Sequence, residues 1–306
     1  MPRLPFLLGI TVILLARVAA AQPSPAIPDR SDPVRYGEYV FRAGGCLECH
    51  TDTKNRGPAL AGGRGLATPY GVFYSPNITP DPETGIGRWT EAQFITAMRD
   101  GKAPDGSPYY PAFPYTSFTK ATDEDLRALW AYLKAQPAVS QPNRPHDLQF
   151  PFGIRSLMWG WRLLFFEPGE FRPDPAQSAE WNRGAYLVEA LAHCGECHTP
   201  RNRLGGLQSD MRFAGSADNA EGDRVPNITP HPKTGIGSWS AADIAGYLGM
   251  GMTPDGDFAG GLMGDVIEHS TRHLTEADRL AMAVYLKSLP PVDYTPPRKQ
   301  QQPAQQ

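Results

Sequence analysis

Two features are missing from this sequence of 306 residues: tracts of basic residues and apolar runs long enough to cross a bilayer. The apolar run at residues 4–15 is about 12 residues long, whereas a transmembrane helix needs about 20. Without a basic tract, and with a formal net charge of −3, nothing in the chain favours nucleic acid as a partner. A content of 41% hydrophobic and 20% charged residues excludes a disordered chain and a multi-span membrane protein.

Cysteine is also scarce, since the chain has four, and all four belong to two copies of one short motif. The copies are CLECH at residues 46–50 and CGECH at residues 194–198. C-x-x-C-H is typical of covalent c-type haem attachment. On a helical turn, positions i and i+3 face the same way, so both sulfurs can reach the two vinyl groups of one porphyrin while the histidine points at the iron. The residues concerned are Cys46, Cys49, His50, Cys194, Cys197 and His198.

A single C-x-x-C-H motif also fits a redox dithiol or half of a zinc site. A zinc site needs further cysteines or histidines at close spacing, and a thioredoxin-like dithiol sits in a βαβ pattern; the sequence shows neither. We therefore predict two covalently bound haem c groups, with His50 and His198 as iron ligands.

Residues 1–21 have the pattern of a secretory signal peptide, because Arg3 precedes the apolar run and three alanines end at Ala21. An uncleaved N-terminal anchor is the alternative. We predict a cleaved signal peptide and a periplasmic location. Exported cysteines normally suggest disulfides, but thioether bonds to haem leave no thiol for one.

The chain contains an internal repeat with a period near 150 residues. SPNITPDPETGIGRWT at 75–90 matches VPNITPHPKTGIGSWS at 225–240, and TDEDLRALWAYLKAQPAV at 122–139 matches TEADRLAMAVYLKSLPPV at 275–292. Such a period indicates two homologous domains rather than a solenoid, whose repeats are shorter. The closing segment of each copy has apolar residues at helical spacing.

The repeat predicts an all-α fold of two tandem domains, each a few helices around one haem, joined by long loops rich in proline and glycine. Thr122 and Thr275 look like helix N-caps, with Asp125 and Asp278 three residues on, close to a capping box. Asn77 and Asn227 are expected to close loops by bonds from side chain to backbone. No convincing strand pattern appears.

Beyond the motifs, the chain resembles the cytochrome c fold and, more narrowly, the dihaem and trihaem cytochrome c subunits of membrane-associated bacterial dehydrogenases that oxidise alcohol, gluconate, aldehyde or nicotinate-type substrates. The stretches that carry the resemblance include GPALAGG, TPYGVFYSPNITPDPETGIGRWT, YPAFPY, FGIRSLMWGWRLLFF and AEWNRGAYLVEALAHCGECHTPRN, within residues 34–292. Trihaem members have a third domain and a membrane-binding tail, so docking that depends on those parts is not carried over.

The resemblance implies electron transfer by a protein that is not itself an enzyme. Electrons would pass from a periplasmic or membrane-associated dehydrogenase towards a quinone, another cytochrome or an oxidase, with at most peripheral membrane contact. The expected organisation is a signal peptide at 1–21, cytochrome c domains at 34–140 and 179–292, a linker at 141–178 and a disordered tail at 293–306.

The expected sixth ligand of the second iron is Met263, which lies in the long stretch before the closing helix, where the family places its axial methionine. A core gap-filler is the alternative for any methionine, and Met250 and Met252 are the reserves. The resemblance also points to the carbonyl of Pro58 as acceptor for the N–H of His50, with no counterpart assigned in the second copy.

Three tryptophan-bearing features each have two interpretations. Trp89 and Trp239 either donate their indole N–H to a haem propionate or are half-buried core residues. The segment at 152–166 is too short for a membrane span and is expected to form a helix or strap between the domains. Its Trp159 and Trp161 could instead belong to a docking patch for the dehydrogenase or the membrane surface.

The position equivalent to Met263, at an offset of 150, is Phe113, whose side chain cannot bind iron. The first iron therefore uses another residue, binds water or another small ligand, or stays five-coordinate. An open iron would allow a rival function, such as binding a gas or reducing peroxide, but no polar residue replaces the ligand to act as acid or base. The candidate replacement ligands are Met98, Tyr109, Tyr110, Tyr115 and His146.

Overall fold

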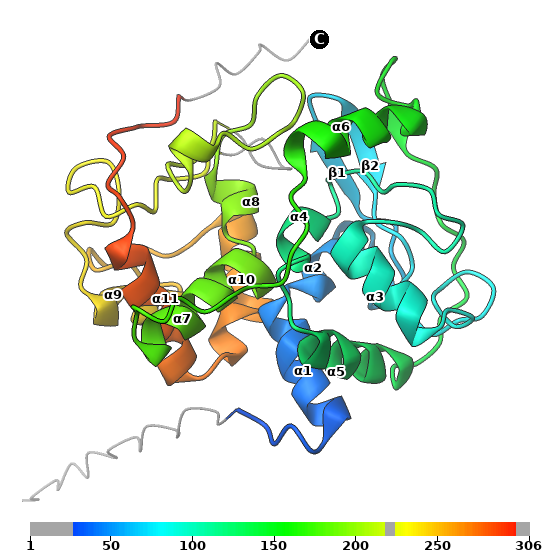
Figure 1. The fold of residues 1–306 in the computed structure, drawn as a ribbon, viewed down its shortest axis with the longest axis horizontal. Helices are drawn as coiled ribbons and strands as arrows, with labels where there is room; N and C mark the ends of the chain where they lie inside the picture. Colours follow the sequence, from blue (N-terminus) through cyan, green and yellow to red (C-terminus); the bar gives the residue numbers. More distant parts are fainter. Residues whose placement is uncertain (1–26, 218–223, 298–306) are drawn as a thin grey trace, which may run out of the picture.

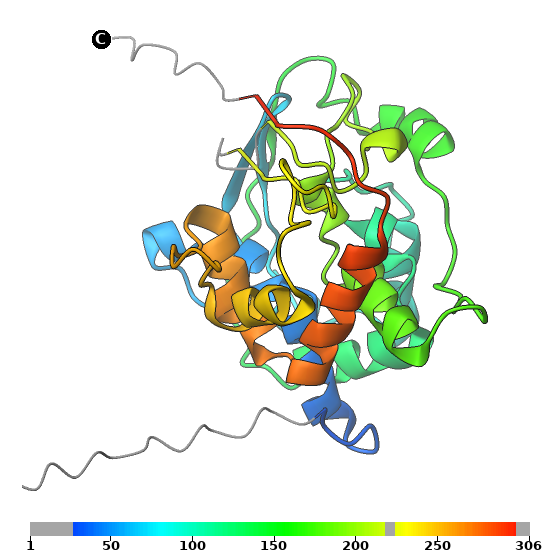
Figure 2. The same cartoon turned by 90° about the vertical axis from the view of Figure 1, so that its left-hand side faces the viewer.

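The computed structural model describes residues 27–217 and 224–297, and the chain folds there into two helical halves that lie side by side (Figure 1). The second half, yellow to red, faces the viewer in Figure 2. The predicted signal peptide at 1–21 lies outside the described residues, as do residues 298–306 of the predicted tail.

The first half is built on the crossing of its first and last helices, α1 and α5. Gly37 makes the crossing close, because a Cβ at this residue would stand 2.0 Å from the carbonyl oxygen of Ala128. The Asp32 side chain caps α1 by accepting from the N–H of Arg35. The α-helices are α1 (Pro33–Ala43), α2 (Cys46–His50), α3 (Glu91–Asp100), α4 (Tyr115–Phe118) and α5 (Asp123–Lys134), and a 3-10 turn η1 spans Thr53–Asn55.

The second half repeats this crossing with α7 and α11. Here a Cβ at Gly184 would stand 1.9 Å from the carbonyl oxygen of Ala281. The elements are α7 (Ala179–Tyr186), continued by the π-helical η3 (Leu187–Leu191), α8 (Gly195–His198), η4 (Ser209–Met211), α9 (Ala241–Met250), α10 (Gly261–His269), η5 (Thr271–His273) and α11 (Glu276–Ser288).

A small antiparallel sheet makes the all-α prediction correct only in part. Strands β1 (Gly65–Thr68), β2 (Gly71–Tyr74) and β3 (Asp147–Leu148) pair in the order β1-β2-β3. A two-residue turn joins β1 to β2, and Gly71, the first residue of β2, follows it with a φ of 120°. Strands of two to four residues carry too little alternation for a pattern to be recognised.

The predicted loop closures by Asn77 and Asn227 are confirmed, and they are the same in both halves. Each side chain is buried, and its amide donates to a backbone carbonyl, that of Val139 at 2.8 Å and that of Val292 at 2.8 Å. Each amide oxygen accepts the N–H of the threonine two residues on. The repeat in sequence is therefore a repeat in local structure.

The predicted N-caps are also confirmed, but the capping boxes are not complete. The hydroxyls of Thr122 and Thr275 accept from the N–H of Asp125 and Asp278, at 3.2 and 3.0 Å. Both aspartates are buried, and their carboxylates accept from side chains elsewhere instead of returning to the cap.

Two tyrosines cross between the halves to reach these aspartates. Tyr39 of α1 donates to Asp278 at 2.6 Å, and Tyr186 of α7 donates to Asp125. Each tyrosine oxygen also accepts, at 3.1 Å, the N–H of the threonine that caps the helix carrying the aspartate. These crossed pairs tie the first helix of each half to the last helix of the other.

The predicted linker range 141–178 includes β3, which belongs to the sheet of the first half, as well as η2 (Arg155–Leu157) and α6 (Met158–Phe165), and it contacts both halves. Trp161 donates its indole N–H to the carbonyl of Leu204 at 2.9 Å, and the Arg162 guanidinium donates to the carbonyl of Asp100. Across the two described ranges, no helix combines the length and the apolar character that a membrane span requires.

Candidate functional site

The two C-x-x-C-H motifs form short helices at matching places in the two halves. In the first, Gly45 with a φ of 57° turns the chain between α1 and α2. In the second, His193 takes this place with a φ of 38°. None of the four cysteines forms a disulfide. Cys46 and Cys194 are half-buried against the hydrophobic core, whereas Cys49 and Cys197 are exposed.

The motif histidines are held by backbone carbonyls. The Nδ1 atom of His50 lies 2.8 Å from the carbonyl oxygen of Pro76, and Nδ1 of His198 lies 2.8 Å from that of Pro226. Burial lowers the pKa of both imidazoles, which favours the neutral form. A proton on Nδ1 leaves the Nε2 lone pair for a metal. The residues present therefore fit the proximal side of a c-type haem.

The assignment of Pro58 as the histidine's acceptor is wrong. The carbonyl of Pro58 accepts from the N–H of Ala61 at 3.3 Å, while the loop that ends at Pro76 returns to His50. Pro226, at an offset of 150 from Pro76, supplies the acceptor left unassigned in the second half. The Pro-Asn pair in both repeated segments marks these prolines as equivalent, but nothing in the sequence alone links them to the histidines.

Met263 lies on a helix, not in a loop as expected. It occupies the first turn of α10 and packs half-buried against the core, whereas Met250 and Met252 are exposed. In the first half, two prolines flank the equivalent position, and proline disfavours helix both at its own position and just before it. Without them, the second half extends the helix across the methionine.

Phe113 stands in a turn enclosed by aromatic rings. Its ring centroid lies 5.6 Å from that of Tyr109, 5.9 Å from that of Phe118 and 6.4 Å from that of Tyr115. Burial raises the pKa of Tyr109 to about 12, so its hydroxyl stays protonated at neutral pH. The surroundings of Phe113 are apolar and aromatic.

The other candidates for the first iron have partners of their own. Met98 is buried in the core on α3, like its counterpart Leu248 on α9. Tyr110 packs against His146 at 5.5 Å, and Nδ1 of His146 accepts the N–H of Tyr74 at 3.1 Å. The ligand of the first iron stays open among these residues and a small molecule.

Trp89 and Trp239 occupy equivalent, half-buried positions against the core. Within the described residues, neither indole N–H donates to the protein. Both N–H groups therefore remain available, and the propionate contact stays a prediction.

The two motifs touch across the interface, which sequence reasoning missed. Nε2 of His193, next to Cys194, lies 3.3 Å from the carbonyl oxygen of Gly44, two residues before Cys46. The His193 ring also packs edge-on against Phe118 at 5.3 Å. The residues that lead into the two attachment motifs thus meet at the interface between the halves.

A glutamate inside each motif has a different environment in the two halves. Glu196 accepts from Thr116 at 2.6 Å and Ser117 at 2.9 Å, and it pairs with Arg201. Burial alone would raise the pKa of Glu196, but Arg201 and the two hydroxyls hold it below its ordinary value. Neither carboxylate oxygen of Glu48 has a hydrogen-bond partner among residues 27–217 and 224–297, and burial raises the pKa of Glu48 to about 7.

Comparisons with known proteins agree with this geometry. The profile of the cytochrome c family matches residues 34–137. A "diheme cytochrome c-type" protein of Cereibacter sphaeroides is 43% identical over 303 residues, which cover 93% of this chain and 98% of that protein. The fructose dehydrogenase cytochrome subunit of Gluconobacter japonicus is 42% identical over 286 residues, and the gluconate 2-dehydrogenase cytochrome c subunit of Pantoea cypripedii is 40% identical over 264.

The lengths of these relatives differ. The matched part covers 92% of this chain but 58% of the fructose dehydrogenase subunit, and 84% of this chain but 59% of the gluconate dehydrogenase subunit. The chain therefore corresponds to a part of these larger proteins and to nearly all of the Cereibacter protein.

Proposed function

Because the chain belongs to the c-type cytochromes, in the group that includes cytochrome c subunits of bacterial dehydrogenases, we propose that it is an electron carrier for a partner dehydrogenase. It receives electrons one at a time and passes them to a quinone, another cytochrome or an oxidase. The observation that carries this proposal is the pair of C-x-x-C-H helices whose histidines are fixed through Nδ1.

Each motif holds one haem c, so the protein is dihaem. Cys46 and Cys49 bind the first haem, and Cys194 and Cys197 bind the second. When bound, each haem supplies an iron that cycles between the ferrous and ferric states. The chain orients the proximal imidazoles, and their bonds to backbone carbonyls raise the basicity of Nε2.

The two haems are unequal in this proposal. In the second half Met263 would supply a thioether sulfur as the further iron ligand, whereas Phe113 offers no lone pair in the first. Since axial methionine raises the potential of haem iron, the first haem has the lower potential unless another methionine replaces the ligand.

The rival reading as a haem enzyme is not favoured. The relatives are named as cytochromes or dehydrogenase cytochrome subunits, and the rings around Phe113 provide cover rather than an acid or base. The aromatic cover fits a shielded electron-transfer centre better than a catalytic one.

The protein acts in the periplasm after cleavage of residues 1–21, with peripheral membrane contact at most. The pattern of Arg3, the apolar run and the alanines that end at Ala21 supports this location. A mature N-terminus at or near Gln22, measured by mass spectrometry of periplasmic protein, would agree, whereas an intact Met1 would contradict cleavage.

Haem content and electron uptake test the main proposal. We expect about two haems per chain by pyridine haemochrome assay, both reduced when a cognate dehydrogenase and its substrate are added. A double Cys194→Ala, Cys197→Ala variant should retain one haem. A parent protein with one haem, or haems that no dehydrogenase reduces, would contradict the proposal.

Carbon monoxide tests the inequality of the haems. Added to the reduced protein, it should shift the Soret band of one haem in two, the one beside Phe113. Binding at both haems would contradict ligation by Met263. Binding at neither would show that another residue replaces the missing methionine.

A further inference from the structure

Helix α6 turns an uncharged apolar surface to solvent. Its outer face, defined here as Trp159, Leu163 and Leu164 together with Leu157 at the end of η2, has exposed fractions of 48%, 87%, 67% and 49%. At 100° per residue, these positions fall within one arc of about 160°. Of the other residues in that arc, Ser156 and Gly160 are uncharged, and Glu167 lies beyond the end of α6. A surface helix normally turns its charged side outward, so this orientation needs an explanation.

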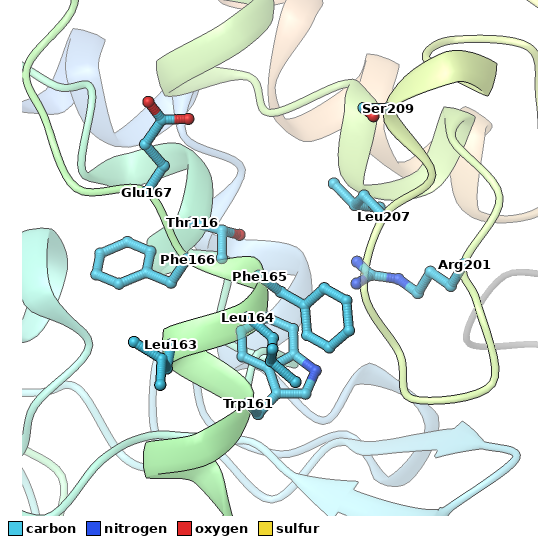
Figure 3. A pocket seen from close by; sticks show the side chains of 10 residues that line it. All are labelled: Thr116, Trp161, Leu163, Leu164, Phe165, Phe166, Glu167, Arg201, Leu207 and Ser209. Atoms are coloured by element: carbon cyan, nitrogen blue, oxygen red, sulfur yellow. The ribbon is translucent and has the colours of Figure 1, made fainter.

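The opposite side of α6 is firmly attached to the protein. Trp161 is 8% exposed and donates to the carbonyl of Leu204 at 2.9 Å. A Cβ at Gly206 would stand 2.4 Å from the Phe165 ring, which shows how closely that ring packs on the second half. Figure 3 shows Trp161 and Phe165 on the side facing the loop with Arg201, and Leu163 on the other side. The outer face is therefore fixed in its outward orientation.

Cationic side chains flank the outer face. The Lys102 ammonium and the Arg162 guanidinium lie 5.9 and 5.8 Å from the Trp159 ring centroid, and Arg155 lies over Tyr110 at 5.3 Å. Among the described residues, none of these three cations forms an ion pair with a carboxylate. Two carboxylates lie nearby, Asp105, which is within electrostatic range of Arg155, and Glu167, which lines the same pocket as Leu163 and Leu164. Three cations against these two carboxylates leave a small positive excess, in a chain whose formal net charge is −3.

The size and chemistry of the surface identify its occupant. An eight-residue helix is about 12 Å long, and a stable protein interface involves about 20–30 residues on each side. Peripheral binding to a bilayer requires fewer residues than a protein interface. A few leucines and a tryptophan that enter the boundary between headgroups and acyl chains are enough when arginine or lysine lies beside them. Unpaired cations add attraction to anionic headgroups.

We propose that the outer face of α6, together with Arg155, Arg162 and Lys102, docks the protein on an anionic lipid surface. Leu163 and Leu164 enter the interfacial layer, and the cations approach the phosphates. This contact is peripheral, and it stands whether or not the proposed electron transfer is correct.

Vesicle sedimentation tests the proposal with the purified holoprotein, bound protein being measured by haem absorbance. The probes are vesicles of phosphatidylcholine alone and of phosphatidylcholine with phosphatidylglycerol. We expect binding to the anionic vesicles that weakens with salt, and at least tenfold weaker binding for the Leu163→Ser, Leu164→Ser variant. Phe258→Ser is the matched control, because Phe258 is 72% exposed in the second half and should not alter binding.

Three results would overturn the proposal. They are no binding to anionic vesicles, equal binding to neutral and anionic vesicles, and unchanged binding by the double serine variant. A variant that binds vesicles like the parent but no longer accepts electrons from a dehydrogenase would assign the outer face to a protein partner instead. Because the leucines are exposed, the variant should keep the parent's haem spectrum and unfolding midpoint.

Discussion

At the scale of single residues, the exchange of Met263 for Phe113 separates two otherwise repeated sites. Replacement of Met263 by Phe should lower the potential of one haem by about 60 mV or more, a tenfold change in the one-electron equilibrium. Spectroelectrochemical titration measures this. The far-red absorption band of methionine-ligated ferric haem should disappear in the same variant.

The reciprocal variant, Phe113→Met, serves as the matched control. If the first iron has room for a ligand, its potential should rise and the far-red band should grow. The prolines on either side of Phe113 hold a turn where α10 has a helix, so a smaller gain than the loss at Met263 is expected. A Met263→Phe variant with unchanged potentials would show that this methionine packs the core only.

The glutamates within the motifs give a second matched pair. Glu196→Gln removes a charge that Arg201 and two hydroxyls stabilise, so it should cost about 2–3 kcal/mol of unfolding free energy. Glu48→Gln should be neutral or stabilising, because the buried Glu48 carboxylate has no partner. Guanidinium unfolding followed by haem absorbance measures both. Equal losses of unfolding free energy in the two variants would contradict the proposed difference between Glu196 and Glu48.

Whether the sequence predicts the role of a residue depends on how far along the chain its partner lies. The spacing within C-x-x-C-H and the offset of Phe113 from Met263 are readable from the chain alone. The acceptor of His50 was not, because the carbonyl of Pro76 reaches it only after a loop of some 25 residues turns back. Only the three-dimensional path of that loop shows that the carbonyl of Pro76, and not that of Pro58, lies next to His50.

At the scale of elements, the helix crossings depend on glycine. Gly37→Ala should destabilise the first half by about 1–3 kcal/mol or more, because the new Cβ meets the backbone of Ala128 at 2.0 Å. Gly160→Ala on α6 is the control, since nothing lies within 4 Å of its Cβ and alanine favours helix by up to about 1 kcal/mol. Denaturant midpoints compare them, and a tolerated Gly37→Ala would argue against the close crossing.

The closing helices were predictable because their apolar spacing and threonine caps agree. The small sheet was not, since its third strand has two residues and lies more than 70 residues beyond the second. The start of α10 was missed for a local reason. Loss of two prolines in the second copy converts a turn into a helix, and the repeat itself had suggested a loop in both places.

At the scale of the whole molecule, the crossed tyrosines hold the halves together. Tyr39→Phe and Tyr186→Phe should each cost about 1–3 kcal/mol of unfolding free energy, because each removes a donor from a buried aspartate. A double variant whose loss is much larger than the sum would show that the halves separate. Haem absorbance and far-UV circular dichroism, followed in parallel, measure this.

The two crossed tyrosines, together with Tyr36, predict that the free energy of unfolding falls at alkaline pH. Burial, and then the neighbouring aspartates, raise the pKa of Tyr36, Tyr39 and Tyr186 above the ordinary value of about 10. A raised pKa contributes stability that is complete below about pH 10 and is lost as the pH rises further. Each tyrosine should contribute a slope of about 1.4 kcal/mol per pH unit.

Unfolding midpoints between about pH 8 and pH 11 measure the slope. In the Tyr39→Phe variant, stability should fall less steeply with rising pH, because one titrating group is gone. Its unfolding midpoint near pH 8 should be only moderately lower than that of the parent. A parent protein whose stability does not fall above about pH 10 would contradict the assignment.

The arrangement of the two halves could not be predicted from the repeat, because a repeat shows that two units exist and not how they meet. Tyr39 and Tyr186 were visible only as parts of similar segments, YGEYV and RGAYL. Their roles became apparent when each was found beside the aspartate of the other half.

These crossed bonds bear on how the molecule can have evolved. A single ancestral unit could satisfy its aspartate with the tyrosine of an identical neighbour, and fusion of two copies would preserve both bonds in one polypeptide. Once fused, the loss of either copy would remove one donor from the buried aspartate of the other, which would keep only the partner in its own half, Tyr36 for Asp125 and Arg183 for Asp278. The two C-x-x-C-H motifs and their surroundings differ, at Phe113 and at Glu48, while the aspartates and their tyrosines remain bound to each other.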